Sequence, residues 1–216
     1  MLNKIEALSY FIGFALGDGY ARIQRYLRKR EHRIKKKAVV EIAQKDDEIR
    51  ENLISIIRTL GYTPYLTYTK SHGRTCPKVN VASKMLYEIT KKYKENPTLL
   101  ITSNNLNRLA ILGGFTDAEG TIAKYLRYYK DRRKYYDKYL YQLVNKNIDL
   151  LNVMSMIISD NISLTPRIIR LTKRCNNKTY YWYRLYVKSR EGVLRIAYLL
   201  KEYSIKARRL LTYIQT

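Results

Sequence analysis

The sequence is poor in the residue types that stabilise small extracellular domains or bind soft metals. It contains two cysteines and two histidines, and neither pair shows the close spacing of a zinc site or a disulfide framework. We therefore predict that Cys76 and Cys175 are free thiols in hairpin turns, without a catalytic role. We expect His32 and His72 to be loop residues that do not bind metal.

Long apolar runs are also missing. No segment reaches the roughly 20 apolar residues that a membrane-spanning helix needs, and the N-terminal residues lack the apolar core of a signal peptide. No long low-complexity segment indicates disorder. We expect a soluble intracellular protein without a membrane partner, in the cytoplasm of a prokaryote or in an organelle of a eukaryote.

Acidic residues are the scarcer of the two charged classes. The chain has 42 Lys and Arg but 18 Asp and Glu, which gives a formal net charge of +24. Residues 1–103 hold 20 basic and 10 acidic residues, and residues 104–216 hold 22 and 8. An excess of this size in both halves favours a long polyanionic partner. Composition alone leaves DNA-binding and RNA-binding proteins equally open.

The most informative feature that is present is an internal repeat. Residues 10–19, YFIGFALGDG, recur as residues 111–120, ILGGFTDAEG, at an offset of 101. Both copies place small residues at every fourth position, where they form one stripe along a helix. Glycine within a helix costs about 1 kcal/mol relative to alanine, so we expect the stripes to allow two helices to pack closely. The predicted interface consists of Ser9, Gly13, Gly17, Ala110, Gly114 and Ala118.

Each copy ends in a carboxylate followed by a glycine, at Asp18 and Glu119. Two carboxylates at close range repel one another unless a cation lies between them. Oxygen ligands suit Mg²⁺, and bound metal ions suit the cleavage of a phosphodiester. Two unrelated helix ends could finish in this way. The recurrence of the acid, the glycine and the small stripe in register favours a shared site.

These residues resemble the nine-residue motif of the LAGLIDADG family, which maps onto Phe11–Gly19 and Leu112–Gly120. The match is to the single-chain form with two motifs, most of whose members are homing endonucleases. The resemblance implies an α+β fold of two pseudo-symmetric αββαββα halves. These halves are residues 1–103, with the linker, and residues 104–216. The resemblance also implies that the repeated helices pair and that the two sheets form a saddle over DNA.

The resemblance also implies a metal site. In that family the eighth motif residue binds the metal, which gives this role to Asp18 and Glu119, with Gly17 and Ala118 beside them. The expected cation is Mg²⁺, and Mn²⁺ or Ca²⁺ could bind in its place. The sixth motif position varies in the family, so we expect Asp117 to be structural.

A second pair of segments superposes at the same offset: residues 44–46 (QKD) and 145–147 (NKN). In the resembling family a polar amide at this strand end, with basic residues nearby, lies beside the scissile phosphates and balances charge there. The resemblance therefore gives catalytic roles to Gln44, Lys45, Lys124, Asn145 and Lys146. The alternative is that Asp46 and Asn147 cap helices while the lysines only face solvent.

Alternating apolar and polar residues predict strands, and apolar residues at helical spacing predict helices. Strands are expected over residues 20–28, 37–44, 63–70, 78–83, 121–130, 137–145, 167–174 and 179–188. Further helices are expected over residues 46–60, 84–95, 147–160, 190–203 and 205–214. Residues 29–35 are predicted to be a turn, with Lys36 at the tip of the hairpin.

Basic residues alternate with apolar ones along these strands, and a two-stranded ribbon can present every second side chain to base edges. The ordinary alternative for such charges is a solvated face. In the C-terminal half we predict that Ile169 and Leu171 point inwards. The predicted DNA contacts of that half are Arg170, Thr172, Arg174, Arg184, Tyr186 and Lys188. Those of the N-terminal half are Arg22, Gln24, Tyr26, Arg28, Lys35, Lys37 and Glu41.

The sequence thus predicts a monomeric endonuclease that cuts both strands of a long, imperfectly palindromic DNA site and needs a divalent metal. The resemblance adds 3′ extensions and mobility of the intron that carries the gene. An RNA maturase that binds intron RNA with the same saddle is the alternative. A general RNA-binding protein is a third interpretation, but it does not explain the paired motifs.

Overall fold

A computed structural model describes residues 2–28, 33–71, 74–129, 131, 133–175 and 178–215. The chain divides into two compact units, Met1–Ala118 (unit 1) and Glu119–Thr216 (unit 2). The division lies beyond residue 103 because helix α5 (Arg108–Glu119) packs along helix α1 (Lys4–Gly17). Most of the second motif copy therefore belongs to the first unit.

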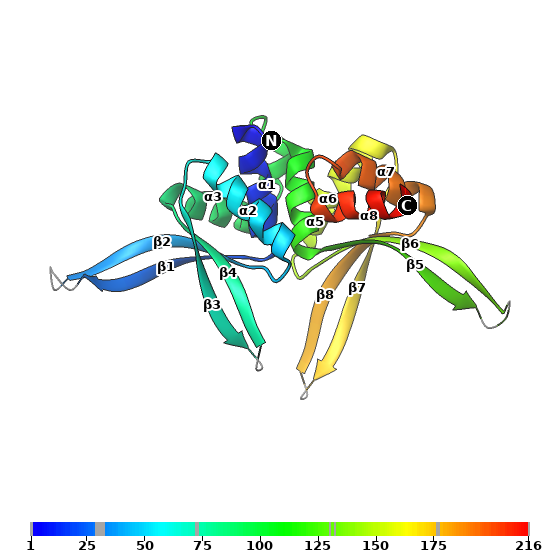
Figure 1. Cartoon of the computed structure of the whole chain (residues 1–216), viewed down its shortest axis with the longest axis horizontal. Helices are drawn as coiled ribbons and strands as arrows, with labels where there is room; N and C mark the ends of the chain where they lie inside the picture. The colour runs from blue at the N-terminus through cyan, green and yellow to red at the C-terminus, as the bar shows by residue number, and fades with distance from the viewer. Residues whose placement is uncertain are drawn as a thin grey trace. The chain divides into compact units, whose positions relative to one another are not determined.

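Unit 1 places its helices on one side of a four-stranded antiparallel sheet (Figure 1). Its remaining elements are β1 (Gly19–Arg28), β2 (Arg33–Ala43), α2 (Asp47–Thr59), β3 (Pro64–Ser71), β4 (Arg74–Ala82), α3 (Lys84–Glu95) and α4 (Leu99–Thr102). The strand order is β1-β2-β4-β3. Helix α4 is a short turn in the predicted linker and was not expected from the sequence.

Unit 2 repeats this plan after α5. Its elements are β5 (Gly120–Tyr129), β6 (Lys134–Asn145), α6 (Ile148–Ile162), β7 (Arg167–Cys175), β8 (Lys178–Val187), α7 (Arg190–Leu200) and α8 (Ile205–Gln215). The strand order β5-β6-β8-β7 matches that of unit 1. The predicted α+β fold with two αββαββα halves is confirmed, and α8 is an addition at the end of the second half.

Side-chain caps fix where several helices begin. The Asn3 side chain accepts from the backbone of Glu6, and the Glu6 carboxylate accepts from the backbone of Asn3, which completes a capping box. Ser83 Oγ accepts from the Leu86 amide at the start of α3. Ser189 caps α7 in the same way. Each cap satisfies a backbone N–H that the helix itself cannot pair, at a gain of about 1 kcal/mol.

Alternation along the strands decides which sheet face is buried. The face covered by helices carries fully or almost fully buried side chains, among them Val40, Ile42, Val79 and Val81 in unit 1 and Tyr141, Leu143, Leu185 and Val187 in unit 2. Burial of one such side chain contributes about 1.5–3 kcal/mol. The opposite face of each sheet, called here the open face, carries no helix of the same unit among the described residues (Figure 1).

The structure corrects three local predictions. Strand β2 begins at Arg33, so part of the expected turn is strand, and Lys36 pairs with Arg25 inside the β1–β2 ladder instead of lying at a tip. Cys76 lies within β4 and not in a turn. Cys175 is the last residue of β7 and pairs with Lys178, so its predicted place at a hairpin turn is not contradicted. In the β1–β2 hairpin, backbone pairing outweighs the weak strand preference of charged side chains. Cys76 is in a strand because it pairs with Thr69 of β3. Residues 29–32, His32 among them, and His72 lie outside the described residues.

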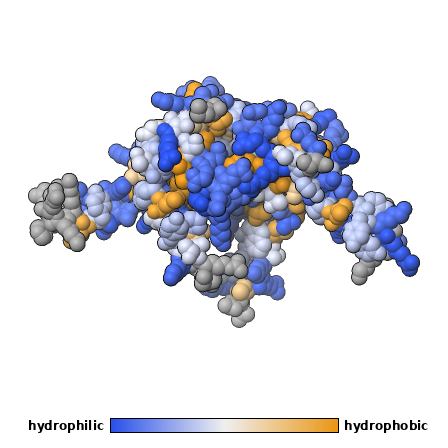
Figure 2. Space-filling view, in the orientation of Figure 1, coloured by the Kyte–Doolittle hydropathy of each residue, from blue (hydrophilic) through white to orange (hydrophobic). Residues whose placement is uncertain are grey.

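The surface agrees with the composition. Hydrophilic residues cover most of the face seen in Figure 2, with small apolar areas between them. Within the described ranges, no helix has both the length and the apolar character needed to cross a membrane.

Candidate functional site

The two copies of the repeated motif form helices that touch at their glycines. A β-carbon at Gly13 would clash with the backbone of Ile111, whose carbonyl carbon would lie 2.8 Å away. A β-carbon at Gly114 would lie 2.9 Å from the carbonyl carbon of Tyr10. Ile111 and Gly114 follow Tyr10 and Gly13 by the repeat offset of 101. The contact is therefore reciprocal, as a pseudo-twofold relation between the helices requires.

The other small residues extend this contact along the helices. Ser9 Oγ accepts from the backbone N–H of Asn107, 2.9 Å away, and donates to the carbonyl oxygen of Ile5. Ala110 is fully buried. Ser9 and Asn107 lie near the starts of α1 and α5, and the paired glycines lie further along both, so the helices run parallel. Their C-terminal ends, with Gly17 and Ala118, consequently lie at the same end of the pair.

Asp117 forms a buried contact between the two helices of the pair. Its side chain is fully buried, and Oδ2 accepts a hydrogen bond from Tyr10 Oη over 2.9 Å. A buried carboxylate needs such a partner because its transfer from water is otherwise very costly. The bond joins α5 to α1, which supports the expected structural role of Asp117.

The two motif carboxylates lie where the helices end. Asp18 follows α1, and its backbone N–H bonds to the carbonyl oxygen of Phe14, while Glu119 is the last residue of α5. Both side chains are half-buried. In unit 2, Asn145 Nδ2 donates to Glu119 Oε1 over 3.4 Å. The structure therefore brings together two of the residues to which the family resemblance gave roles in catalysis.

The strand-end segments have the same geometry in both units. Gln44 Oε1 accepts from the Asp46 amide, and Asn145 Oδ1 accepts from the Asn147 amide, each at 2.9 Å. The residue that follows the lysine also caps the next helix, so Asp46 caps α2 and Asn147 caps α6. Capping and a role for the amide are thus compatible. The lysines between them, residues 45 and 146, are exposed.

Lys124 lies away from the strand-end segments and from Glu119. It follows Gly120 by four residues along β5, a distance of roughly 13 Å, and its Nζ forms an ion pair with Asp137 at 3.1 Å. The hydrogen bond to Asp137 raises the pKa of Lys124, although partial desolvation opposes this. Lys124 also lies beside Tyr213 of α8, on the sheet face that the helices cover. The structure does not bring Lys124 to Glu119.

The donor set at the helix ends suits a hard divalent cation. Asp18 and Glu119 offer carboxylate oxygens, which Mg²⁺ and Ca²⁺ prefer. Among the described residues, no three His, Cys, Asp or Glu side chains gather into a group that could hold a metal. A cation bound by either acid would therefore need water and phosphate oxygens as its other ligands, which is usual for Mg²⁺ at phosphate-processing sites.

The predicted contacts of the N-terminal half share the open face of unit 1. In the register of β1 with β2, Gln24 pairs with Lys37 and Tyr26 pairs with Lys35, so each pair points to one side. Arg22 and Glu41 form an ion pair on the same side. The side chain of Arg28 lies outside the described residues.

Sequence reasoning missed Lys78, which lies next to this ion pair. Lys78 pairs with Ala43 in the β2–β4 ladder, and its Nζ contacts Glu41 at 2.6 Å. The signal was present in the sequence, because Lys78 and Asn80 alternate with the buried residues Val79 and Val81.

In unit 2 the predicted common face is wrong. Ile169 pairs with Arg184, while Arg170 pairs with Tyr183. The prediction therefore placed each of these β7 side chains on the wrong face of the sheet. The six residues divide into Arg184, Tyr186 and Lys188 on the open face and Arg170, Thr172 and Arg174 on the other. The guanidinium of Arg170 lies 5.2 Å from the ring centroid of Tyr181.

The cause of this error is the adjacent pair Ile168 and Ile169. Either isoleucine could point inwards, and a shift of one residue turns every side chain of a strand over. Ile168 lies opposite the fully buried Leu185, and this contact decides the register. The structure also adds Arg167, opposite Tyr186, to the open face.

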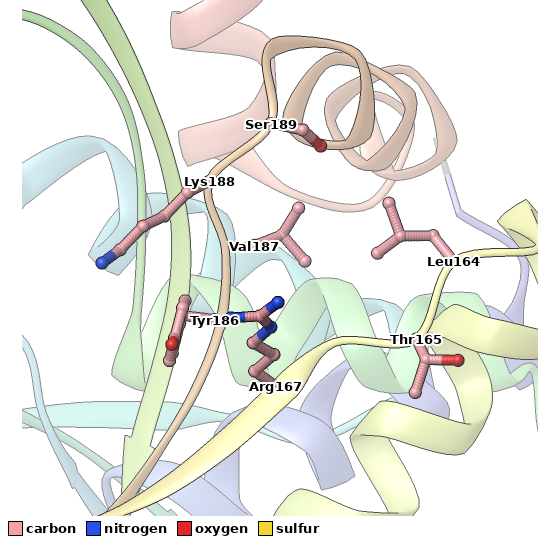
Figure 3. Close-up of a pocket in the computed structure, with 7 residues that line it drawn as sticks. All are labelled: Leu164, Thr165, Arg167, Tyr186, Val187, Lys188 and Ser189. Atoms are coloured by element: carbon pink, nitrogen blue, oxygen red, sulfur yellow. The ribbon is translucent and has the colours of Figure 1, made fainter.

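A hollow of about 430 Å³ lies beside these residues, where β7 and β8 meet α7. It is lined by Leu164, Thr165, Arg167, Tyr186, Val187, Lys188 and Ser189. Figure 3 shows the Arg167 guanidinium directed towards Tyr186 and the Lys188 chain pointing away from Leu164. Lys188 Nζ lies 4.8 Å from the ring centroid of Tyr186. Two cations beside a phenol suit an anionic group such as a phosphate.

Further along the open face, the β5–β6 hairpin carries a second group of cations around a tyrosine. Arg127 and Lys138 lie 5.3 and 4.9 Å from the ring centroid of Tyr129. The hydrogen bond with Lys138 lowers the pKa of Tyr129, against a smaller opposing effect of desolvation. The positive charge of unit 2 therefore extends along the length of this hairpin.

No family model and no curated protein matches the sequence. The solved structures do give matches. A crystal structure of I-DmoI in complex with DNA and Ca is similar over 98% of this chain and 100% of that chain, with a TM-score of 0.63 and 18% identity. Full-length DUF199/WhiA from Thermatoga maritima is similar over 100% of this chain and 61% of that one, with a TM-score of 0.59 and 12% identity.

A mutant of I-SmaMI is similar over 95% of this chain and 88% of that one, with a TM-score of 0.58 and 12% identity. Identities this low establish a common fold. The three matches cover almost the whole chain, both units included. The chain has the fold of I-DmoI, a single-chain, two-domain LAGLIDADG homing endonuclease.

Proposed function

We propose that the protein is a site-specific DNA endonuclease that depends on a divalent metal and cuts both strands of a long, asymmetric target. The observation that carries the proposal is the reciprocal packing of α1 and α5, each followed or ended by one motif carboxylate. Two equivalent acids in one chain suit two equivalent phosphodiesters, one on each DNA strand.

Charge and fold support DNA as the substrate. The net charge of +24 favours a polyanion, and basic residues lie on the open face of each sheet. I-DmoI, which shares the fold, has been crystallised with DNA and Ca and with DNA and Mn. One structure of an I-DmoI variant contains target DNA nicked in the coding strand, in the presence of Mn.

Different residues would have different roles at each scissile phosphate. Asp18 and Glu119 each contribute a carboxylate ligand to a divalent cation, with the backbone at Gly17 and Ala118 beside them. When bound, the cation would lower the pKa of a water molecule and polarise a phosphoryl oxygen. Asn145 orients the Glu119 carboxylate, and Gln44 is its counterpart in unit 1. The exposed residues Lys45 and Lys146 would offset negative charge near the phosphates.

We further propose that the enzyme acts as a monomer inside the cell, leaves 3′ extensions and promotes mobility of the intron that carries its gene. The two halves within one chain support the monomer, because they supply both acids. Intron RNA as a second partner has no observation of its own in its favour.

The test uses plasmid DNA that carries the joined sequences flanking the reading frame. Intact protein is incubated with this plasmid and with an unrelated plasmid, with Mg²⁺ or with a chelator. Linear product from the first plasmid only, and only with metal, is the expected result. Sequencing of the ends determines the polarity of the extensions. If neither this plasmid nor a randomised target library is cut selectively with Mg²⁺ or Mn²⁺, the proposal is wrong.

A further inference from the structure

The open face of unit 1 holds an acid between two cations. Glu41 lies on the central strand β2. Its Oε2 accepts from Arg22 Nη2 over 3.0 Å, and its Oε1 accepts from Lys78 Nζ over 2.6 Å. Arg22 belongs to β1 and Lys78 to β4, so one carboxylate joins three neighbouring strands. The side chains are 40%, 13% and 21% exposed for Arg22, Glu41 and Lys78.

The carboxylate remains charged in this position. Burial alone would raise the pKa of Glu41, but the hydrogen bond and charge of Lys78, followed by those of Arg22, outweigh burial and hold the pKa below its usual range. At neutral pH the acid therefore cancels one of the two positive charges on this part of the face.

Unit 2 has no such acid at the equivalent place. The repeat offset of 101 carries Glu41 onto Gln142 and Arg22 onto Ala123. Gln142 Nε2 lies 3.5 Å from Thr121 Oγ1 and has no charge to share with a cation. Both units have the same strand order, so the fold does not require the acid. The acid and its arginine partner therefore distinguish unit 1 from unit 2 within the same strand order.

Affinity for DNA does not explain the acid. A carboxylate on a face that meets phosphates reduces attraction to DNA of every sequence, because attraction grows with the number of phosphates that cations neutralise. Selectivity for particular bases does explain the acid. Arg22 uses one Nη2 hydrogen for Glu41 and keeps its Nη1 hydrogens and the second Nη2 hydrogen. Those donors can form the paired contact with O6 and N7 of guanine, provided that the guanidinium is held in place.

We propose that Glu41 is a specificity-determining positioning residue for the half-site that unit 1 binds. It holds Arg22 and Lys78 where they contact guanine edges, and it weakens binding to DNA that lacks guanine at those positions. This inference rests on the proposed DNA-binding function and adds a base preference to one half of the target.

The test compares Glu41→Gln with Glu51→Gln, a variant with the same change in charge at an exposed position of α2. Binding to a library randomised over both half-sites, and to unrelated DNA, is measured at low and at physiological salt. Thermal unfolding shows that each variant is folded. For Glu41→Gln we expect tighter binding to unrelated DNA and a loss of guanine preference of about tenfold or more at one or two positions. These positions should lie in one half-site, and Glu51→Gln should keep the wild-type preferences.

Arg22→Lys supplies a second measurement, because it keeps the charge but removes the planar fork. It should lose guanine preference at a position that Glu41→Gln also affects. The inference is overturned if Glu41→Gln retains every base preference of the wild type, or if its losses fall equally on both half-sites. A wild-type protein that binds no sequence selectively would instead overturn the proposed function itself, so the two failures can be told apart.

Discussion

Asn145 connects the end of strand β6 to the acid that ends α5. Its Nδ2 donates to Glu119 Oε1 over 3.4 Å, while its Oδ1 accepts from the backbone N–H of Asn147. Because a backbone N–H can only donate, this second bond fixes which end of the amide carries the oxygen. The amide hydrogens are therefore directed at Glu119, and they orient the carboxylate that we propose as a metal ligand.

Replacement of Asn145 by alanine should slow DNA cleavage by about 10- to 100-fold, the usual effect of losing a partner that orients a metal ligand. The Mg²⁺ concentration needed for half-maximal rate should rise as well. Single-turnover cleavage measured over a range of Mg²⁺ concentrations checks both effects. Asn161→Ala, at an exposed position of α6, is the control. An Asn145→Ala enzyme with the wild-type rate and metal dependence would show that this contact is only structural.

The helix contact could be predicted from the sequence because the same pattern of small residues occurs in both copies of the repeat. Small residues at a spacing of four have few other uses, and Gly13 and Gly114 both meet the facing backbone. The contact between Asn145 and Glu119 was implied only through the family resemblance. The two residues are 26 positions apart, and no pattern in the chain indicates that a strand end lies beside a helix end.

A larger residue at the glycine contact should destabilise the protein. Gly13→Leu and Gly114→Leu each force a side chain against a facing backbone that cannot move aside, and we expect a loss of about 3 kcal/mol in the free energy of unfolding. Denaturant unfolding measures this loss. Ser55→Leu places the same final side chain at an exposed position of α2 and should be close to neutral. Wild-type stability in both glycine variants would place the helix contact elsewhere.

The register of β7 separates two arginines that the sequence placed together. Arg184 on the open face should contact a base, so Arg184→Ala should cost about 1–3 kcal/mol of binding and relax specificity near one base pair. Arg170, on the opposite face beside Tyr181, should have no effect on base preference when changed to alanine. Binding over a target library distinguishes the two variants. A relaxed base preference in Arg170→Ala alone would contradict the register.

The register itself could not have been predicted from this strand. The residues Ile168 and Ile169 give no single alternating pattern, and the decision comes from the contact of Ile168 with the buried Leu185, which lies on another strand. Strand β4 is the opposite case. There the buried Val79 and Val81 alternate with Lys78 and Asn80, so the outward position of Lys78 was available to sequence analysis.

The ion pairs of Glu41 should make part of the stability depend on pH. The pKa of Glu41 in the folded protein lies below its ordinary value of 4.5, so its contribution is fully present above that value and is lost as the pH falls through the folded pKa. Glu41→Gln should therefore cost about 1 kcal/mol at neutral pH, since the exposed part of Arg22 is screened by solvent. Unfolding of both proteins measured from pH 7 downwards should show the difference shrinking in acid. A difference that stays constant with pH would mean that the charge of Glu41 contributes nothing.

The most direct test of the proposed function is the removal of charge from each motif acid. Asp18→Asn and Glu119→Gln keep the size of the side chains but remove a carboxylate ligand, and Glu202→Gln changes an exposed acid of unit 2 as the control. Double-strand cleavage with Mg²⁺ should fall by about 100-fold or more in each motif variant, while target affinity, thermal stability and the activity of the control stay near wild type. Wild-type double-strand cleavage by both Asp18→Asn and Glu119→Gln would contradict the account.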